Sequence, residues 1–213
     1  MTIINVALGE CEVAVITDSR QSAITSAGLR ALPQHAQKCE AFPMLGVLLA
    51  HSGDAGAGAV AHELGNYLRF GIVAGNVLEL AKRLPSVLSE ISSTHHFSGF
   101  GRFALAGVVA DRAYCFLLDA PSWTAQPVPQ GAWVQPSPPP AELPPAAAQD
   151  ERQPVADLTP QRAVPVFRDS LVTIRRSVEQ QHEQNPVSCG GAIIESYIDN
   201  SLITRQYVLR VCE

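Results

Sequence analysis

The first fifth of the chain carries three side chains whose groups can serve nucleophilic catalysis: the hydroxyl of Thr2, the carboxylate of Asp18 and the ammonium of Lys38. A hydroxyl can act as a nucleophile, and charged groups can stabilise the charge that develops during its attack. Lys38 stands out because the chain has two lysines against 13 arginines. This scarcity favours a specific role for Lys38 over a chance surface charge.

Each of these residues also has an ordinary interpretation. Met-Thr is a common start for a protein, Asp18 fits a cap at a strand end or turn, and Lys38 fits a solvated strand charge. The choice between the two interpretations depends on the elements that would position the three side chains.

Four short segments rich in β-branched and apolar residues predict strands before any helix, at residues 2–8, 12–18, 36–42 and 45–51. Residues 21–37 are expected to form a loop. Apolar residues at steps of three and four predict helices at residues 54–69, 74–92 and 160–182, the second kinked at Pro85.

Further strands are predicted at residues 103–110, 112–118, 190–198 and 202–211. Proline density between about 119 and 160 predicts an extended, polyproline-like surface excursion, and the alternative is a disordered insertion without a role. Strands in hairpins and helices in separate blocks predict an α+β fold of antiparallel sheets with helices outside.

Composition predicts one globular domain over residues 1–213. A chain of 213 residues with 46% hydrophobic and 16% charged residues can bury one substantial core. The net charge of −5 and the scattered arginines argue against a phosphate-binding surface, so no nucleic-acid partner is expected.

No metal, cofactor or membrane partner is indicated. The five cysteines lie far apart without a Cys-x-x-Cys pair, which indicates free thiols in a reducing compartment. Adjacent His95 and His96 would point to opposite faces of a strand, and the glycines at 53–58 lack the Lys-Ser/Thr of a phosphate loop. The absence of a signal peptide and of a run of roughly 18 apolar residues predicts a cytoplasmic location.

Five stretches resemble the pattern of proteasome β-subunits, a family of N-terminal-nucleophile (Ntn) hydrolases that includes bacterial proteasome-like proteins. The stretches are Met-Thr-Ile-Ile at the start, Thr-Asp-Ser-Arg at 17–20, Lys38, Ala-His-Ser-Gly-Asp at 50–54 and Ser-Cys-Gly-Gly-Ala at 188–192. The resemblance covers most of the chain except the proline-rich part. It implies a four-layer αββα sandwich of two antiparallel sheets flanked by helices.

The resemblance implies that Thr2, exposed by removal of Met1, is the nucleophile and that its own α-amino group is the base. A reference pKa near 8 suits a free α-amine to this task at neutral pH. By the same resemblance, Asp18 orients and charge-pairs Lys38, and Lys38 stabilises the alkoxide of Thr2. Arg20 would be an outer partner of this group.

The resemblance places an oxyanion donor at the amide of Ser52 or Gly53, where a helix N-terminus adds a favourable dipole. Two departures concern the residues that hold the N-terminal amine in the family. A Ser-Gly-Ser-like loop has no clear match in the proline-rich stretch, and Asn185 and Pro186 replace the usual Asp. Cys189 stands at a usual Ser, for which Ser188 is the candidate substitute.

Three functions follow from the resemblance. The leading hypothesis is a threonine-type peptidase or amide hydrolase that acts on a peptide or protein substrate within a homo-oligomeric ring. The second is a non-catalytic ring or scaffold subunit that keeps the fold and has lost the site. The third is an Ntn amidohydrolase for a small amide.

Overall fold

The computed structural model describes residues 3–26, 28–71, 75–135, 167–186 and 189–212. Two of the candidate site residues, Thr2 and Ser188, lie outside the described residues. Most of the proline-rich stretch, from residue 136 onward, also lies outside them.

The first sheet has five antiparallel strands in the order β10-β1-β2-β11-β12. The N-terminal strand therefore lies inside a sheet, as the sequence predicts. The strands are β1 (Ile4–Leu8), β2 (Glu12–Asp18), β10 (Gly131–Val134), β11 (Gly191–Asp199) and β12 (Thr204–Cys212).

The second sheet is also antiparallel, with the strand order β5-β6-β7-β8-β9. A short 3-10 helix, η1 (Pro43–Leu45), joins its first two strands. The strands are β5 (Cys39–Phe42), β6 (Val47–Gly53), β7 (Gly101–Val109), β8 (Arg112–Asp119) and β9 (Ala125–Pro127).

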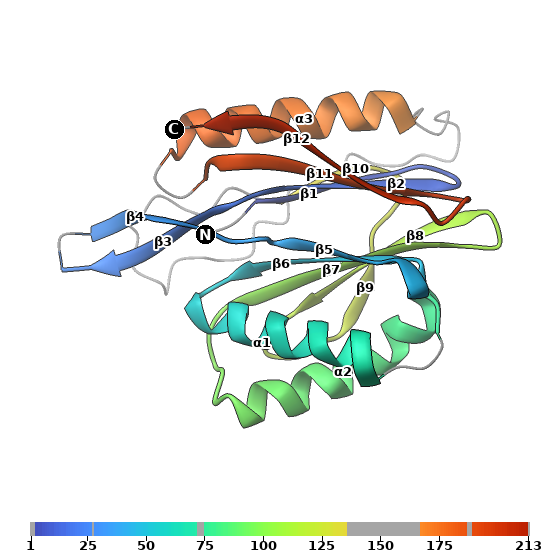
Figure 1. The fold of residues 1–213 in the computed structure, drawn as a ribbon, viewed down its shortest axis with the longest axis horizontal. Coiled ribbons are helices and arrows are strands. Elements are labelled where there is room, and N and C mark those ends of the chain that lie inside the picture. The colour runs from blue at the N-terminus through green and yellow to red at the C-terminus, as the bar shows by residue number, and fades with distance from the viewer. Residues whose placement is uncertain (1–2, 27, 72–74, 136–166, 187–188, 213) are drawn as a thin grey trace.

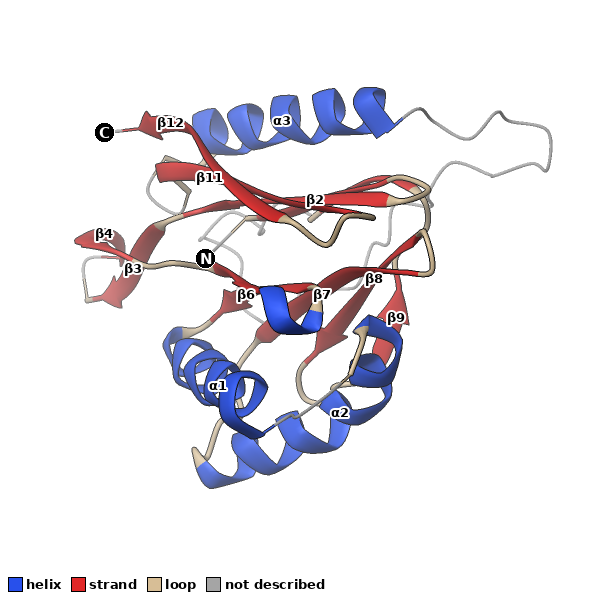
Figure 2. Ribbon diagram, turned by 45° about the vertical axis from the view of Figure 1, so that its right-hand side comes forward, coloured by secondary structure: helices blue, strands red, loops and turns tan. Residues whose placement is uncertain are grey.

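Helices cover the outer faces of both sheets, as Figures 1 and 2 show. The helices are α1 (Ala55–Asn66), the π-helix η2 (Tyr67–Gly71), α2 (Val77–Thr94) and α3 (Phe167–Gln184). The predicted apolar stripe of α2 is buried, and α2 continues through Pro85. Helices α1 and α2 lie against the second sheet, whereas α3 lies against β1, β2 and β10 of the first.

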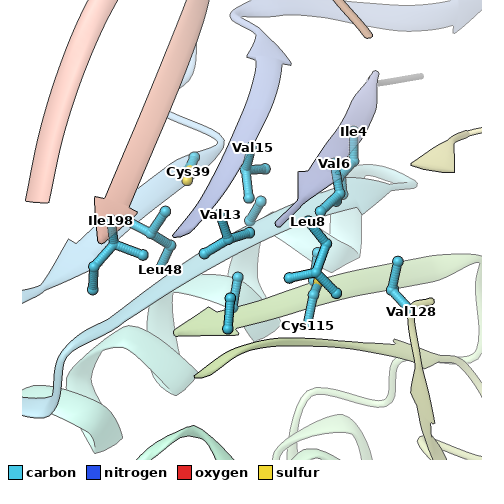
Figure 3. Packing of buried hydrophobic residues seen from close by; sticks show 14 of the residues in the cluster. Ile4, Val6, Leu8, Val13, Val15, Cys39, Leu48, Cys115, Val128 and Ile198 are labelled. Atoms are coloured by element: carbon cyan, nitrogen blue, oxygen red, sulfur yellow. The ribbon is translucent and has the colours of Figure 1, made fainter. Parts of the chain in front are cut away.

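The two sheets pack face to face through a core of small and branched side chains (Figure 3). Alternation along β2 divides its side chains between two cores. Val13 and Val15 point into the core between the sheets, and Ala14 and Ile16 point toward α3. Because both faces of β1 and β2 are covered, both strands are buried along nearly their whole length.

Three sequence predictions are wrong in detail. The expected loop at 21–37 contains a two-stranded sheet, β3 (Arg20–Thr25) paired with β4 (Gly28–His35), so six strands rather than four precede α1. Lys38 lies directly before β5 and not inside a strand. The start of the proline-rich stretch forms the short strands β9 and β10, because its prolines stand at strand ends and edges where a missing amide is tolerated.

The predicted α+β class, with antiparallel sheets and helices outside, is confirmed. In the described part of the chain, no helix combines the length and the apolar character needed to cross a membrane. Within the same residues, no group of three or more His, Cys, Asp or Glu side chains is arranged to hold a metal ion.

Candidate active site

Asp18 is a buried carboxylate at the end of β2, with 1% of its surface exposed. Its Oδ1 accepts a hydrogen bond from the Ile3 amide at 3.0 Å and another from Lys38 Nζ at 3.0 Å. Its Oδ2 accepts from the Gly190 amide at 3.1 Å. Asp18 therefore joins the N-terminal strand, the segment before β5 and the turn before β11.

Lys38 is a buried ammonium, 4% exposed, that reaches Asp18 from the end of a loop. Its Nζ also donates a short hydrogen bond to the backbone carbonyl of Arg20. Burial lowers the pKa of Lys38 below its ordinary value, because desolvation penalises the charged form more than Asp18 favours it. The structure thus brings together the two charged residues that the sequence singled out.

The turn before β11 needs two glycines to approach the end of β2. Gly191 has a φ of +69°, and a Cβ there would lie 2.6 Å from both Ser19 Oγ and His35 Nδ1. A Cβ on Gly190, whose φ is +148°, would lie 2.9 Å from Arg20 Nε. Only glycine accepts both the dihedral angles and the close contact.

Ser19 and Arg20 tie the neighbouring segments to this turn. Ser19 Oγ accepts from the Ala192 amide at 2.8 Å and lies 2.9 Å from His35 Nδ1, so its own proton is free to point at that nitrogen. Arg20 donates from its guanidinium to the Pro186 carbonyl at 2.9 Å. Arg20 is thus an outer partner of the Asp18–Lys38 pair: its backbone carbonyl accepts from Lys38, and its guanidinium charge contributes to lowering the pKa of Lys38.

Ser52 and Gly53 end β6 beside Lys38. The preceding residue, His51, donates its amide to the Lys38 carbonyl at 2.8 Å, which holds the end of β6 against the ammonium-bearing segment. Ser52 is 1% exposed, and its hydroxyl has no hydrogen-bond partner among the described residues. Gly53 has a φ of +146°, and a Cβ there would lie 2.3 Å from the Phe100 carbonyl oxygen.

Buried neutral groups surround the charged pair. Burial lowers the pKa of His51 to about 4, so its ring is neutral at physiological pH. Burial also raises the pKa of Cys189 to about 12, so this thiol carries no charge. Asp18 and Lys38 are therefore opposite charges beside two uncharged side chains, with the Arg20 guanidinium as a further charge nearby.

A second polar cluster, of three buried amide side chains, holds the N-terminal strand. Gln135 Oε1 accepts from the Ile4 amide at 3.1 Å, and the Gln135 amide donates to Asn5 Oδ1 at 3.0 Å. Gln181 of α3 completes the ring: its Nε2 donates to the Gln135 carbonyl at 2.8 Å, and its Oε1 accepts from Asn5 at 3.4 Å. We call Asn5, Gln135 and Gln181 the amide ring.

The sequence did not identify the amide ring or the Ser19–His35 contact. Asn5 lies in a strand and Gln181 in a helix. The sequence pattern of each element predicts whether a side chain is buried, but not which groups it contacts. Gln135 falls inside the proline-rich stretch, where no strand was expected. A buried amide leaves no signal of its own in a single sequence, because its partners come from distant segments.

No family model and no curated protein matches the chain. Solved structures of the same class, mixed α/β proteins built on antiparallel sheets, do match.

One is titled Anbu (ancestral beta-subunit) from Yersinia bercovieri, with 11% identity, a TM-score of 0.67 and coverage of 98% of this chain and 87% of that chain. Another is an Anbu (Gly-1) mutant from Hyphomicrobium sp. strain MC1, with 12% identity, a TM-score of 0.66 and coverage of 98% and 86%. At such identities the likeness concerns the fold alone.

These structures correct the family resemblance drawn from the sequence motifs. The assignment to the proteasome β-subunit type is wrong, because the structural neighbours are Anbu proteins, which are proteasome-like but form a distinct family. The described residues of the short motifs, at 17–20, 50–54 and 189–192, belong to segments that meet at one end of the two sheets. Shared local geometry of this kind does not separate one proteasome-like family from another.

Proposed function

We propose that the chain is an N-terminal threonine hydrolase that cleaves amide bonds, with Thr2 as its nucleophile after removal of Met1. The observation that carries the proposal is the double use of Asp18 Oδ1, which accepts from both the Ile3 amide and the Lys38 ammonium at 3.0 Å. Ile3 is the next residue after Thr2 in the chain. One carboxylate oxygen therefore anchors both the backbone adjoining Thr2 and the proposed catalytic cation.

In the proposed reaction, the α-amino group of Thr2 takes the hydroxyl proton as the oxygen attacks the amide carbonyl. The resulting ammonium returns this proton to the leaving amine, which leaves an ester on Thr2. A water molecule then attacks the ester, and the same amine accepts the water's proton and passes it to the departing Thr2 oxygen. The acid product and free Thr2 are released.

Lys38 would stabilise the Thr2 oxygen as negative charge develops. Two of its three N–H groups meet described acceptors, the Asp18 carboxylate and the Arg20 carbonyl, which leaves the third for this role. An ammonium among buried uncharged groups acts more strongly than one in water. The amide of Ser52 or Gly53 is the proposed donor to the carbonyl oxygen of the substrate, and Ser188 a proposed further contact to the N-terminal amine.

We further propose that the arrangement of layers is the αββα sandwich of Ntn hydrolases. Likeness to chains named as ancestral β-subunits supports a homo-oligomeric ring and a peptide or protein substrate. A single domain over residues 1–213 and a cytoplasmic location remain predictions from the sequence.

A non-catalytic ring subunit is the second candidate. The feature that favours it is Cys189, an uncharged buried thiol next to the charged pair. The family resemblance implied a serine hydroxyl at this position. A thiol is a weaker hydrogen-bond partner than a hydroxyl for an N-terminal amine.

The test joins intact-mass measurement with labelling by a peptide boronate and hydrolysis of fluorogenic peptides and simple acyl amides. We expect a mass without Met1, a boronate adduct, and loss of both adduct and hydrolysis in Thr2→Ala. Thr173→Ala, an exposed threonine of α3, serves as the matched control and should behave as the unmodified chain. Retained Met1 together with an unlabelled assembled particle supports the non-catalytic subunit, and cleavage of simple amides alone supports a small-amide hydrolase.

A further inference from the structure

Strand β12 is an edge of the first sheet. Among the described residues it pairs only with β11, so the other side of the strand presents a row of backbone N–H and C=O groups. Figure 1 shows β12 beside β11, and the main contacts of α3 are with β1, β2 and β10. An open edge of this kind is a template for another strand.

The middle of this edge strand carries large apolar side chains that are exposed to solvent. Three consecutive residues are large and exposed, with exposed fractions of 49% for Tyr207, 63% for Val208 and 40% for Leu209. The preceding turn adds Leu202 at 46% and Ile203 at 53%. Lysines and prolines, which protect sheet edges in many proteins, are absent from 204–212.

We propose that β12 pairs antiparallel with β12 of a second copy of this chain about a two-fold axis. The two five-stranded sheets then join into one continuous sheet across the interface. This inference goes beyond the proposed function and does not depend on catalysis.

Side-chain chemistry selects the register. The pairing with β11 places Arg205 and Tyr207 on one face of β12, because they lie opposite Tyr197 and Glu195. It places Gln206 and Val208 on the other face, opposite Ser196 and Ile194. Opposite residues in a joined antiparallel sheet must share a face, so only shifts by even numbers of residues are allowed.

One allowed register is self-complementary. When Gln206 lies opposite Gln206 of the second copy, Arg205 lies opposite Tyr207 of that copy, and Thr204 lies opposite its Val208. The symmetry supplies the Arg–Tyr and Thr–Val pairs twice each. A guanidinium against an aromatic ring is favourable, and Arg205 already lies 5.9 Å from the Tyr197 ring centroid on the same face.

The neighbouring registers are worse. A shift by two residues in one direction places Arg205 opposite Arg205 of the second copy, which opposes like charges. A shift in the other direction places Arg205 opposite Leu209, at the bulge, and leaves only 206–208 paired within the flat part of the edge. A bulge at Leu209, where the pairing with β11 changes register, limits the flat part of the edge to 204–208.

The first test measures the mass of the full-length chain by native mass spectrometry and light scattering across a concentration series. We expect dimers, or an assembly containing pairs of copies, that Val208→Lys and Tyr207→Lys weaken at least tenfold. Val172→Lys is the matched control, since Val172 is an apolar residue of α3 with 47% exposure, and it should leave the assembly unchanged. Circular dichroism checks that each variant is folded.

The second test reads the register by cross-linking. Under mild oxidation, a mixture of Arg205→Cys and Tyr207→Cys chains should form disulfide-linked pairs, whereas neither variant alone should exceed the background of the unmodified chain. A chain that stays monomeric, or an assembly whose mass both lysine variants leave intact, would overturn the inference. If the lysine variants disrupt the pairing but the mixed cross-link does not form, the proposed register is wrong. If this edge captures only unrelated proteins, the choice of a second copy as the partner is wrong.

Discussion

The Lys38 ammonium lies 3.0 Å from the Asp18 carboxylate, and both side chains are almost completely buried. A buried ion pair is costly to form and costly to break, because the remaining partner keeps its charge without compensation. The pair is therefore a poor general means of stabilisation, and its presence at the end of β2 favours a chemical role.

Breaking the pair from either side should destabilise the protein. Lys38→Met and Asp18→Asn should each lower the free energy of unfolding by about 3–5 kcal/mol. The double variant should lose less than the sum of the two, since neither charge remains uncompensated. Urea unfolding measures the stability, and boronate labelling reports whether the site is functional. We expect the double variant to recover part of the stability and to remain unlabelled. Additive losses would show that the two charges are not coupled.

The lowered pKa of Lys38 predicts opposite pH dependences for activity and stability. Activity should rise as the α-amine of Thr2 loses its proton near pH 8, then fall as Lys38 deprotonates below pH 10.5. Across this upper window the unfolded chain binds more protons than the folded chain, so Lys38 makes the free energy of unfolding increase with pH. Profiles of kcat/KM and urea unfolding measure the two trends.

The other lysine supplies the control for this pH dependence. Lys38→Arg should remove the alkaline decline, because a guanidinium keeps its charge. Lys82→Arg, on the exposed side of α2, should reproduce the unmodified profile. An alkaline decline that persists in Lys38→Arg would assign it to another group.

The amide ring should matter to both stability and the site. Gln181→Leu leaves buried groups of Asn5 and Gln135 without their partner, which predicts a loss of about 1–3 kcal/mol. Because Gln135 also holds the Ile4 amide, we expect kcat to fall more than KM changes in protein that remains folded. Gln184→Leu, an exposed glutamine of the same helix, is the control and should leave both quantities unchanged.

Gly191 should not tolerate a side chain. Gly191→Ala would place a methyl group 2.6 Å from Ser19 Oγ at a left-handed φ, so we expect a loss of at least about 2 kcal/mol. Gly58→Ala is the control, since a Cβ there meets no atom within 4 Å and α1 should gain about 0.5–1 kcal/mol. Urea unfolding measures the stability of both variants. Equal stability changes in the two variants would contradict the close approach of Gly191 to Ser19.

Much of the fold could be predicted from sequence because pattern and structure agree in the buried elements. Strand β2 and the apolar stripe of α2 follow the expected periods of two and 3.6 residues. The β3–β4 hairpin was missed because residues 20–35 mix small, polar and proline residues without clear alternation. Because the hairpin projects from the two sheets, neither of its faces has to be apolar to pack against them.

The candidate site was predictable only where it uses charged residues. Lys38 was identified by its type and scarcity and Asp18 by the family resemblance, and the structure brings them together. The backbone amides of Ile3 and Gly190 could not be found in this way, because every residue carries an amide and only the fold selects which ones converge. Thr2 and Ser188 remain predictions.

The β3–β4 hairpin leaves and returns at one place. Its first strand follows Ser19, its last residue, His35, contacts Ser19 again at 2.9 Å, and Ala36 donates to the Ser19 carbonyl at 2.9 Å. These contacts hold the two ends of the hairpin together at Ser19, directly before the segment that carries Lys38. Evolution or an engineer could lengthen, shorten or decorate the tip while the distance between carboxylate and ammonium stays as it is.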